Sequence, residues 1–159
     1  MDVAQPLRGI LALRYLVVGA TKQMKAPPLT APNRADELWK HTCFEAFVQP
    51  AGSDAYYEFN FSPSSSWAAY RFDGYRAGMT SAFELPTPEI TTTSGENQFE
   101  IEAKVDVRGL AGLTDSSAWR LALTAILEDD QGMKSYWALK HPPGKPDFHH
   151  ADGFALELP

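Results

Sequence analysis

Most of this 159-residue chain is built from short runs in which apolar and polar residues alternate, separated by turn-forming residues. Between Phe99 and Val107 every second residue is apolar, and Glu, Lys or Asp occupies each position in between. Because side chains alternate between the two faces of a strand, this period of two is typical of a half-buried antiparallel strand. Runs of this kind predict strands over residues 11–17, 43–48, 56–61, 67–72, 99–107, 119–127, 134–139 and 154–158.

No segment shows a convincing amphipathic helical period, so we predict an all-β protein. Two antiparallel sheets packed as a β-sandwich are the economical way to bury one face of each strand. Residues 21–35 contain three prolines and are predicted to form a long loop, and residues 129–132 to form a hairpin turn. At this length the chain is expected to form a single domain over residues 1–159.

The charge balance excludes some classes of partner. The chain has 14 basic and 20 acidic residues, a formal net charge of -6 and no cluster of Lys or Arg. This argues against nucleic acid and against an anionic membrane surface. Arg14 interrupts the apolar segment 9–20, which we interpret as a strand rather than a signal peptide, so a cytoplasmic protein is expected. The single cysteine, Cys43, excludes an internal disulfide.

Three segments resemble, in order, motifs of carbohydrate-binding module family nine and its DOMON relatives. Residues 38–47 place a tryptophan before a strand that contains Glu45 and Phe47, and residues 56–63 read Tyr-Tyr-Glu-Phe-Asn-Phe-Ser-Pro. Near the C-terminus, Pro-Asp-Phe-His at 146–149 precedes Gly-Phe-Ala-Leu-Glu-Leu at 153–158. The chain looks like a small bacterial DOMON-like protein, and the resemblance implies an antiparallel sandwich of jelly-roll or immunoglobulin-like type. Members bind sugars or haem, so the resemblance indicates a fold rather than one activity.

Aromatic residues crowd the segment 56–75, and strand alternation turns part of them away from the sandwich interior. Aromatic rings stack on the C–H faces of sugars while neighbouring polar groups bind hydroxyls. We therefore expect a non-catalytic module that binds a carbohydrate or a similar polyhydroxylated small molecule and needs no cofactor. The residues expected to bind this ligand are Trp67, Tyr70, Arg71, Arg76, Trp137 and His149.

Two other functions remain open at this point. The DOMON resemblance implies a haem module as the first, with Met79 and His149 as the axial ligands. The second is a homo-oligomeric structural protein whose aromatic face is buried between copies. Asp147, His149 and His150, with His141, form the densest titratable cluster. We interpret Asp147 and His149 as locking the last loop by hydrogen bonds rather than as a metal site, and we expect His150 to be exposed.

Glu45 and Glu58 lie on neighbouring predicted strands and could face each other. A pair of carboxyl groups flanking the scissile bond is what a glycosidase requires. Carboxylates on the face of a sheet are, however, usually solvated or paired with arginine. We expect that arrangement for Glu45 and Glu58, and we expect no catalytic residues.

Overall fold

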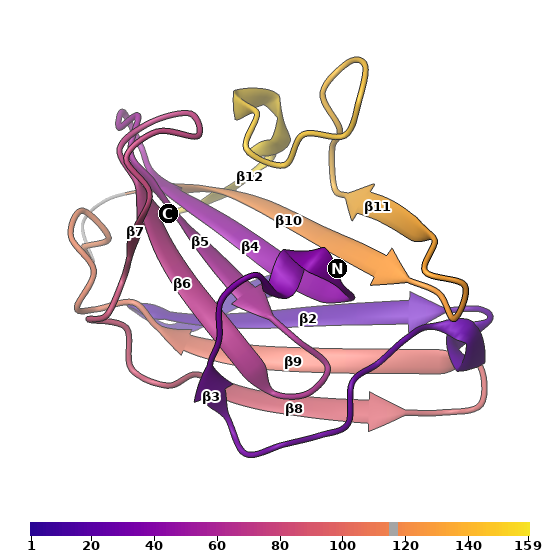
Figure 1. The fold of residues 1–159 in the computed structure, drawn as a ribbon. Helices are drawn as coiled ribbons and strands as arrows, with labels where there is room; N and C mark the ends of the chain where they lie inside the picture. The colour runs from indigo at the N-terminus through magenta and orange to yellow at the C-terminus, as the bar shows by residue number, and fades with distance from the viewer. Residues whose placement is uncertain (115–117) are drawn as a thin grey trace.

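The computed structural model describes residues 1–114 and 118–159 as two facing β-sheets (Figure 1). The smaller sheet has the strand order β1 (Asp2–Leu7), β2 (Ile10–Val18), β9 (Gln98–Asp106), β8 (Glu89–Ser94). The larger sheet has the order β11 (Lys134–Ala138), β10 (Trp119–Glu128), β4 (Cys43–Pro50), β5 (Tyr56–Phe61), β6 (Ser66–Phe72), β3 (Asn33–Arg34). In the same sheet β12 (Leu156–Leu158) pairs with β10, and β7 (Thr80–Ser81) pairs with β6.

All strand pairs are antiparallel except β3 with β6, which confirms the predicted all-β sandwich. Three short 3₁₀ turns complete the elements: η1 (Thr21–Gln23), η2 (Leu38–Lys40) and η3 (Ala151–Gly153). The part of the chain that the structure describes contains no helix long and apolar enough to cross a membrane.

Each of the eight predicted strands is present, and four further strands are not apparent from the sequence. β8 reads Glu-Ile-Thr-Thr-Thr-Ser and is a largely exposed edge strand, so it lacks apolar alternation. β1 lies at the other edge of that sheet and contains Pro6, which an edge strand tolerates. β3 and β7 are only two residues long. The closing strand begins at Leu156 rather than Phe154, because the backbone N–H groups of Phe154 and Ala155 bond to Ala151 and Gly153 in the turn formed by η3.

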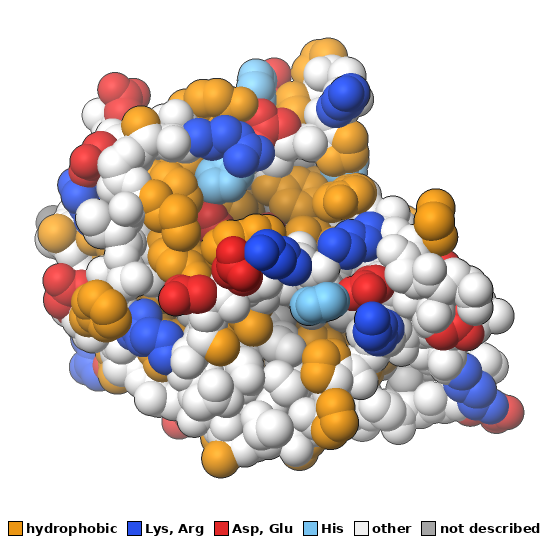
Figure 2. Space-filling model, viewed as in Figure 1, with side chains coloured by type: hydrophobic (Ala, Val, Ile, Leu, Met, Phe, Trp, Pro, Cys, Tyr) orange, Lys and Arg blue, Asp and Glu red, His pale blue; other side chains and the backbone are white. Residues whose placement is uncertain are grey.

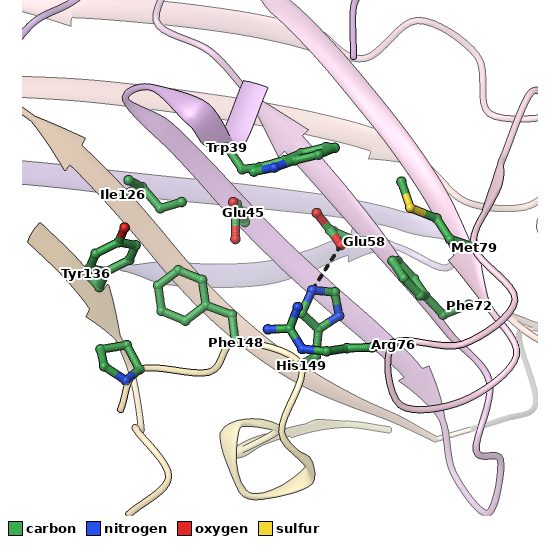
Figure 3. Close-up of a pocket in the computed structure, with 11 residues that line it drawn as sticks. Trp39, Glu45, Glu58, Phe72, Arg76, Met79, Ile126, Tyr136, Phe148 and His149 are labelled. Atoms are coloured by element: carbon green, nitrogen blue, oxygen red, sulfur yellow. Dashed lines mark ion pairs between the residues drawn. The ribbon is translucent and has the colours of Figure 1, made fainter. Parts of the chain in front are cut away.

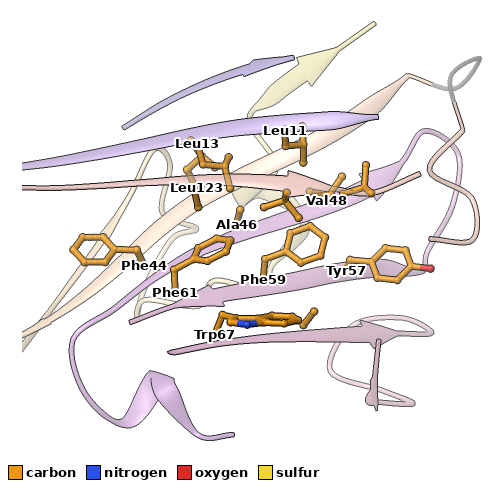
Figure 4. Packing of buried hydrophobic residues seen from close by; sticks show 14 of the residues in the cluster. Leu11, Leu13, Phe44, Ala46, Val48, Tyr57, Phe59, Phe61, Trp67 and Leu123 are labelled. Carbon is orange, nitrogen blue, oxygen red and sulfur yellow. The ribbon is translucent and has the colours of Figure 1, made fainter. Parts of the chain in front are cut away.

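The sandwich interior is one continuous apolar cluster between the sheets (Figure 4). β2 contributes Leu11 and Leu13, β4 contributes Phe44 and β5 contributes Phe59, each at most 2% exposed. Phe44 stacks on Phe99 of β9 with the ring centroids 5.9 Å apart and lies 5.4 Å from the Tyr15 ring of β2, so two aromatic pairs join the sheets. Burial of these side chains is the main favourable contribution to folding.

The outer face of the large sheet is also covered, which corrects the expectation of aromatic residues free for recognition. Tyr56, Tyr70 and Phe72 point away from the sandwich interior, yet each is at most 5% exposed. They form a second apolar cluster with Phe47 and Phe154, packed against η2 and the segment between β11 and β12 (Figure 1). β4 and β5 are consequently buried on both faces, and their polar side chains are withdrawn from water.

Replacing Phe59 with alanine should lower the free energy of unfolding by about 3–5 kcal/mol, because a fully buried ring leaves a cavity in the packed interior. Leu29→Ala is the control: Leu29 is exposed in the loop before β3, so we expect a change within about 0.5 kcal/mol. Urea unfolding measures both values. Equal stabilities of the two variants would contradict the two-sheet core.

Candidate functional site

A cavity of about 390 Å³ opens on the outer face of the large sheet, where the space-filling view is hollowed (Figure 2). Its floor comes from β4 and β5, and its walls from η2, β6, β10, β11 and the two loops that follow β6 and β11. Side chains from distant parts of the sequence therefore meet at one place (Figure 3). The lining residues are Trp39, Glu45, Glu58, Phe72, Arg76, Met79, Ile126, Tyr136, Pro146, Phe148 and His149.

Two glutamates form the polar floor of this cavity. In the register of β4 and β5, Glu45 pairs with Asn60 and Glu58 pairs with Phe47, so the glutamates are diagonal neighbours on one face. Glu45 and Glu58 are only 2% and 5% exposed. The expectation that they are solvated or paired with arginine is therefore wrong. The segments packed over the outer face of the sheet bury them.

Neutral donors satisfy part of the hydrogen-bonding capacity of these carboxyl groups. The Thr124 hydroxyl donates to Glu45 Oε2 over 3.0 Å, and the Asn60 amide donates to Glu58 Oε1 over 2.8 Å. Among the described residues, no Lys or Arg lies within 4.0 Å of either carboxyl group. The charged form of each glutamate consequently lacks a fixed cation in contact with it.

Burial without a counter-charge favours the protonated carboxyl group. Loss of hydration, followed by repulsion from Glu58, raises the pKa of Glu45 to about 8. Loss of hydration also raises the pKa of Glu58 to about 7. The two groups titrate as a pair, and around neutral pH the floor of the cavity holds protons that exposed glutamates would have lost.

His149 connects the floor to the loop that covers it. Its Nδ1 lies 2.7 Å from the Tyr56 hydroxyl, and its Nε2 lies 3.7 Å from Glu58 Oε2. The ring packs edge-on against Phe47 and Phe72, each with a centroid separation of 5.1 Å. Burial, with a contribution from nearby Arg76, lowers the pKa of His149 to about 4. A neutral ring that accepts the Tyr56 proton at Nδ1 keeps its own proton on Nε2, facing Glu58.

Arg76 joins the two loops above the floor. Its Nη2 lies 2.8 Å from Asp147 Oδ1, and the neighbouring Tyr75 hydroxyl donates to Asp147 Oδ2 over 2.5 Å. The Arg76 backbone N–H donates to the Tyr56 hydroxyl, and Asp147 Oδ1 also accepts the His149 backbone N–H. The loop after β6 and the loop after β11 are thereby tied to each other and to β5.

The structure brings three of the sequence-predicted residues to the cavity. Arg76, Met79 and His149 all line it. Tyr70 lies beside it on β6, where its hydroxyl donates to Asp36 over 2.7 Å and its ring packs edge-on against Trp39. These contacts make Tyr70 a support for Trp39 rather than a lining residue.

The other three predicted residues lie elsewhere. Trp67 is 3% exposed inside the sandwich, with the Arg34 guanidinium 4.1 Å from its ring centroid. Arg71 shares the Trp67 face of β6 and pairs with Asp73 at 2.6 Å. Trp137 is 55% exposed on β11 and borders a separate small hollow. Side-chain alternation explains the first two positions, because residues 67, 69 and 71 face opposite to residues 68, 70 and 72.

Four aromatic lining residues were not predicted from the sequence: Trp39, Phe72, Tyr136 and Phe148. Trp39 lies in η2. Glu37, the residue before η2, has a φ of 62°. Phe148 lies in a Pro-rich loop without periodicity. Strand alternation does not extend to the segments that contain Trp39 and Phe148, so it could not predict their place in the cavity. The sequence feature that could have indicated these two residues was their position within the motifs of the family resemblance.

The geometry does not fit the haem ligands suggested by the sequence. Met79 and His149 line the same cavity, but the two ring nitrogens of His149 face Tyr56 and Glu58. An axial ligand needs a ring nitrogen directed at open space. Within the described ranges, no group of three or more His, Cys, Asp or Glu side chains is arranged to hold a metal ion.

The fold is similar to that of a solved structure from Bacteroides uniformis, named a "putative carbohydrate-binding protein". The TM-score is 0.63 at 16% sequence identity, and the superposition covers 91% of this chain and 70% of that chain. At this identity the likeness shows the fold alone. No protein-family model and no curated protein matches this chain.

Replacing Glu45 with glutamine should make the free energy of unfolding less sensitive to alkaline pH. The pKa of Glu45 is higher in the folded than in the unfolded protein. The wild-type protein therefore loses stability as the pH rises from about 4.5 through about 8. Between about pH 5 and about pH 8.5, Glu45→Gln should gain at least about 1.4 kcal/mol of unfolding free energy relative to the wild type.

Urea unfolding at several pH values measures this difference. Glu157→Gln, on the exposed position of β12, is the matched control and should follow the wild-type profile. A difference between Glu45→Gln and the wild type that is constant over this pH range would show that Glu45 is ionised throughout.

Proposed function

We propose that this protein is a non-catalytic module that binds a carbohydrate or a similar polyhydroxylated small ligand in the cavity on the large sheet. The observation that carries the proposal is that aromatic rings and buried polar groups line one cavity of about 390 Å³. This volume lies in the range of small-molecule sites, which combine mostly apolar walls with a few placed polar groups.

The walls and the floor of the cavity would contact different parts of a sugar. Trp39 and Phe148 offer ring faces for the C–H surface of a sugar. Glu45 and Glu58 accept hydrogen bonds from hydroxyls, and each also donates one in its protonated form. Arg76 and His149 contribute further donors at the rim. A site built to bond hydroxyls discriminates against ligands that lack them, because its buried polar groups would then be unpaired.

The raised pKa values of the two floor carboxyl groups are the reason to propose a non-catalytic protein. A glycosidase needs one carboxyl group as an acid and one ionised as a base or nucleophile, with environments that push their pKa values apart. Glu45 and Glu58 both have raised pKa values and lie side by side on one floor. Neither is held ionised at neutral pH by a fixed cation.

The fold supports the proposal without deciding the ligand. The similar structure from Bacteroides uniformis carries a name that refers to carbohydrate binding. The motifs around Trp39, Tyr56 and Phe148 resemble carbohydrate-binding module family nine and its DOMON relatives, and we propose kinship with that group. Binding in the cytoplasm is part of the same proposal.

Replacing Trp39 with alanine should weaken sugar binding at least about tenfold, or about 1.4 kcal/mol, because a stacking face is lost from the cavity wall. Trp137→Ala is the control, since Trp137 lies outside the cavity and its loss should leave affinity unchanged.

A thermal-shift screen with mono- and oligosaccharides finds the ligand, and calorimetric titration then measures both variants. Thermal unfolding of the free variants checks that each is folded, because Trp39 also packs on Tyr70. The proposal fails if no saccharide binds, or if Trp137→Ala weakens binding as much as Trp39→Ala does.

A further inference from the structure

The floor of the cavity has more acidic groups than the surrounding side chains can neutralise. Glu45 has no basic side chain within 4.0 Å among the described residues, and Glu58 has only the neutral ring of His149 at 3.7 Å. Arg76 is the one Lys or Arg among the described lining residues, and Asp147 already pairs with it at 2.8 Å. When Glu45 and Glu58 are ionised, the side chains around them therefore carry too little positive charge to neutralise them.

The titratable and hydrogen-bonding groups facing the floor do not supply that charge. The nearest ones are neutral donors or acceptors, and Arg76 acts on both glutamates from beyond 4.0 Å. These groups are Cys43 on β4, Tyr56 and Asn60 on β5, Tyr70 on β6, Thr124 on β10, Tyr136 on β11, and His149 on the loop after β11, with the Arg76–Asp147 pair above them. A cationic ligand would supply the missing charge in place of the protons.

The walls of the cavity also suit a cation. Trp39, Phe72, Tyr136 and Phe148 line it, and in Figure 3 the rings of Trp39, Tyr136 and Phe148 lie around the Glu45 carboxyl group. The electron-rich faces of aromatic rings attract ammonium groups, most strongly where water is excluded. Aromatic walls above unpaired carboxyl groups are two independent features, and both favour the same ligand chemistry.

We propose that the ligand of this cavity carries an ammonium group, which binds against Glu45 and Glu58 between the aromatic walls. This inference rests on the proposed function, so the ligand class it specifies is an amino sugar or a similar aminated polyol. The hydroxyls of such a ligand would bond the remaining polar groups at the rim, Arg76 and His149. The ammonium group would replace the proton that the carboxyl pair otherwise holds.

A neutral sugar gains less from the same floor. A hydroxyl makes neutral hydrogen bonds with a protonated carboxyl group, whereas an ammonium group makes charge-assisted bonds, which are roughly twice as strong. Arg76 opposes a second cation, and the Asp147 carboxylate bonded to it offsets part of that repulsion. The balance favours the cationic ligand over its neutral counterpart.

Calorimetric titration of the wild-type protein at pH 7 with glucosamine, glucose and N-acetylglucosamine tests the inference. These sugars differ at one position, so the comparison isolates the ammonium group. Glucosamine should bind at least about tenfold more tightly than either neutral sugar. Repeating the titration in buffers of different ionisation enthalpy, with choline as a probe of fixed charge, should show proton release when choline binds, because the ammonium group displaces protons from the floor.

Glu45→Gln and Glu58→Gln should each reduce the preference for glucosamine, and Trp137→Ala should retain it. Measuring both glutamate variants keeps the test valid if one of them fails to fold. Glucosamine binding no tighter than glucose and N-acetylglucosamine would overturn the inference, and the neutral sugars would then still support the proposed function. If none of the three sugars binds, the inference fails, and the wider saccharide screen then decides the proposed function.

Discussion

Both faces of β4 and β5 are buried, and this double burial sets the position of the two glutamates and of the cavity above them. Phe44 and Phe59 point into the sandwich, so Glu45 and Glu58 must point outward by alternation. In an ordinary sandwich those glutamates would be in water. Here the segments that carry Trp39 and Phe148 pack over them, and the carboxyl groups become the floor of a cavity.

The loops that make this cover are held by a small set of polar contacts. The Arg76–Asp147 pair joins the loop after β6 to the loop after β11, and Tyr56 bonds both Arg76 and His149. Exposed ion pairs contribute little stability individually, but this one shares its carboxylate with the Tyr75 hydroxyl and the His149 backbone. Together these polar contacts position ring faces and hydrogen-bond donors above the two glutamates.

The strands could be predicted from the sequence because each has its own period-two pattern, as in Gln98–Asp106. The site could be predicted only in part. Arg76 and His149 were found as polar residues near aromatic ones, but Trp67 and Tyr70 were assigned to one surface although residues three apart on a strand face opposite sides. Trp39 and Phe148 line the same cavity although they lie in irregular segments more than a hundred residues apart. No local sequence pattern predicts that these two segments meet.

Titration of the two floor carboxyl groups shows whether they hold their protons near neutral pH. Carbon-13 NMR of glutamate side-chain carboxyls, assigned with Glu45→Gln and Glu58→Gln, follows each group through a pH series of the ligand-free protein. The structure predicts two resonances whose midpoints lie well above the usual glutamate range, because hydration is lost and no cation contacts either carboxyl group. Midpoints of about 4.5 for both groups would show that the floor is open to water, and would contradict the account.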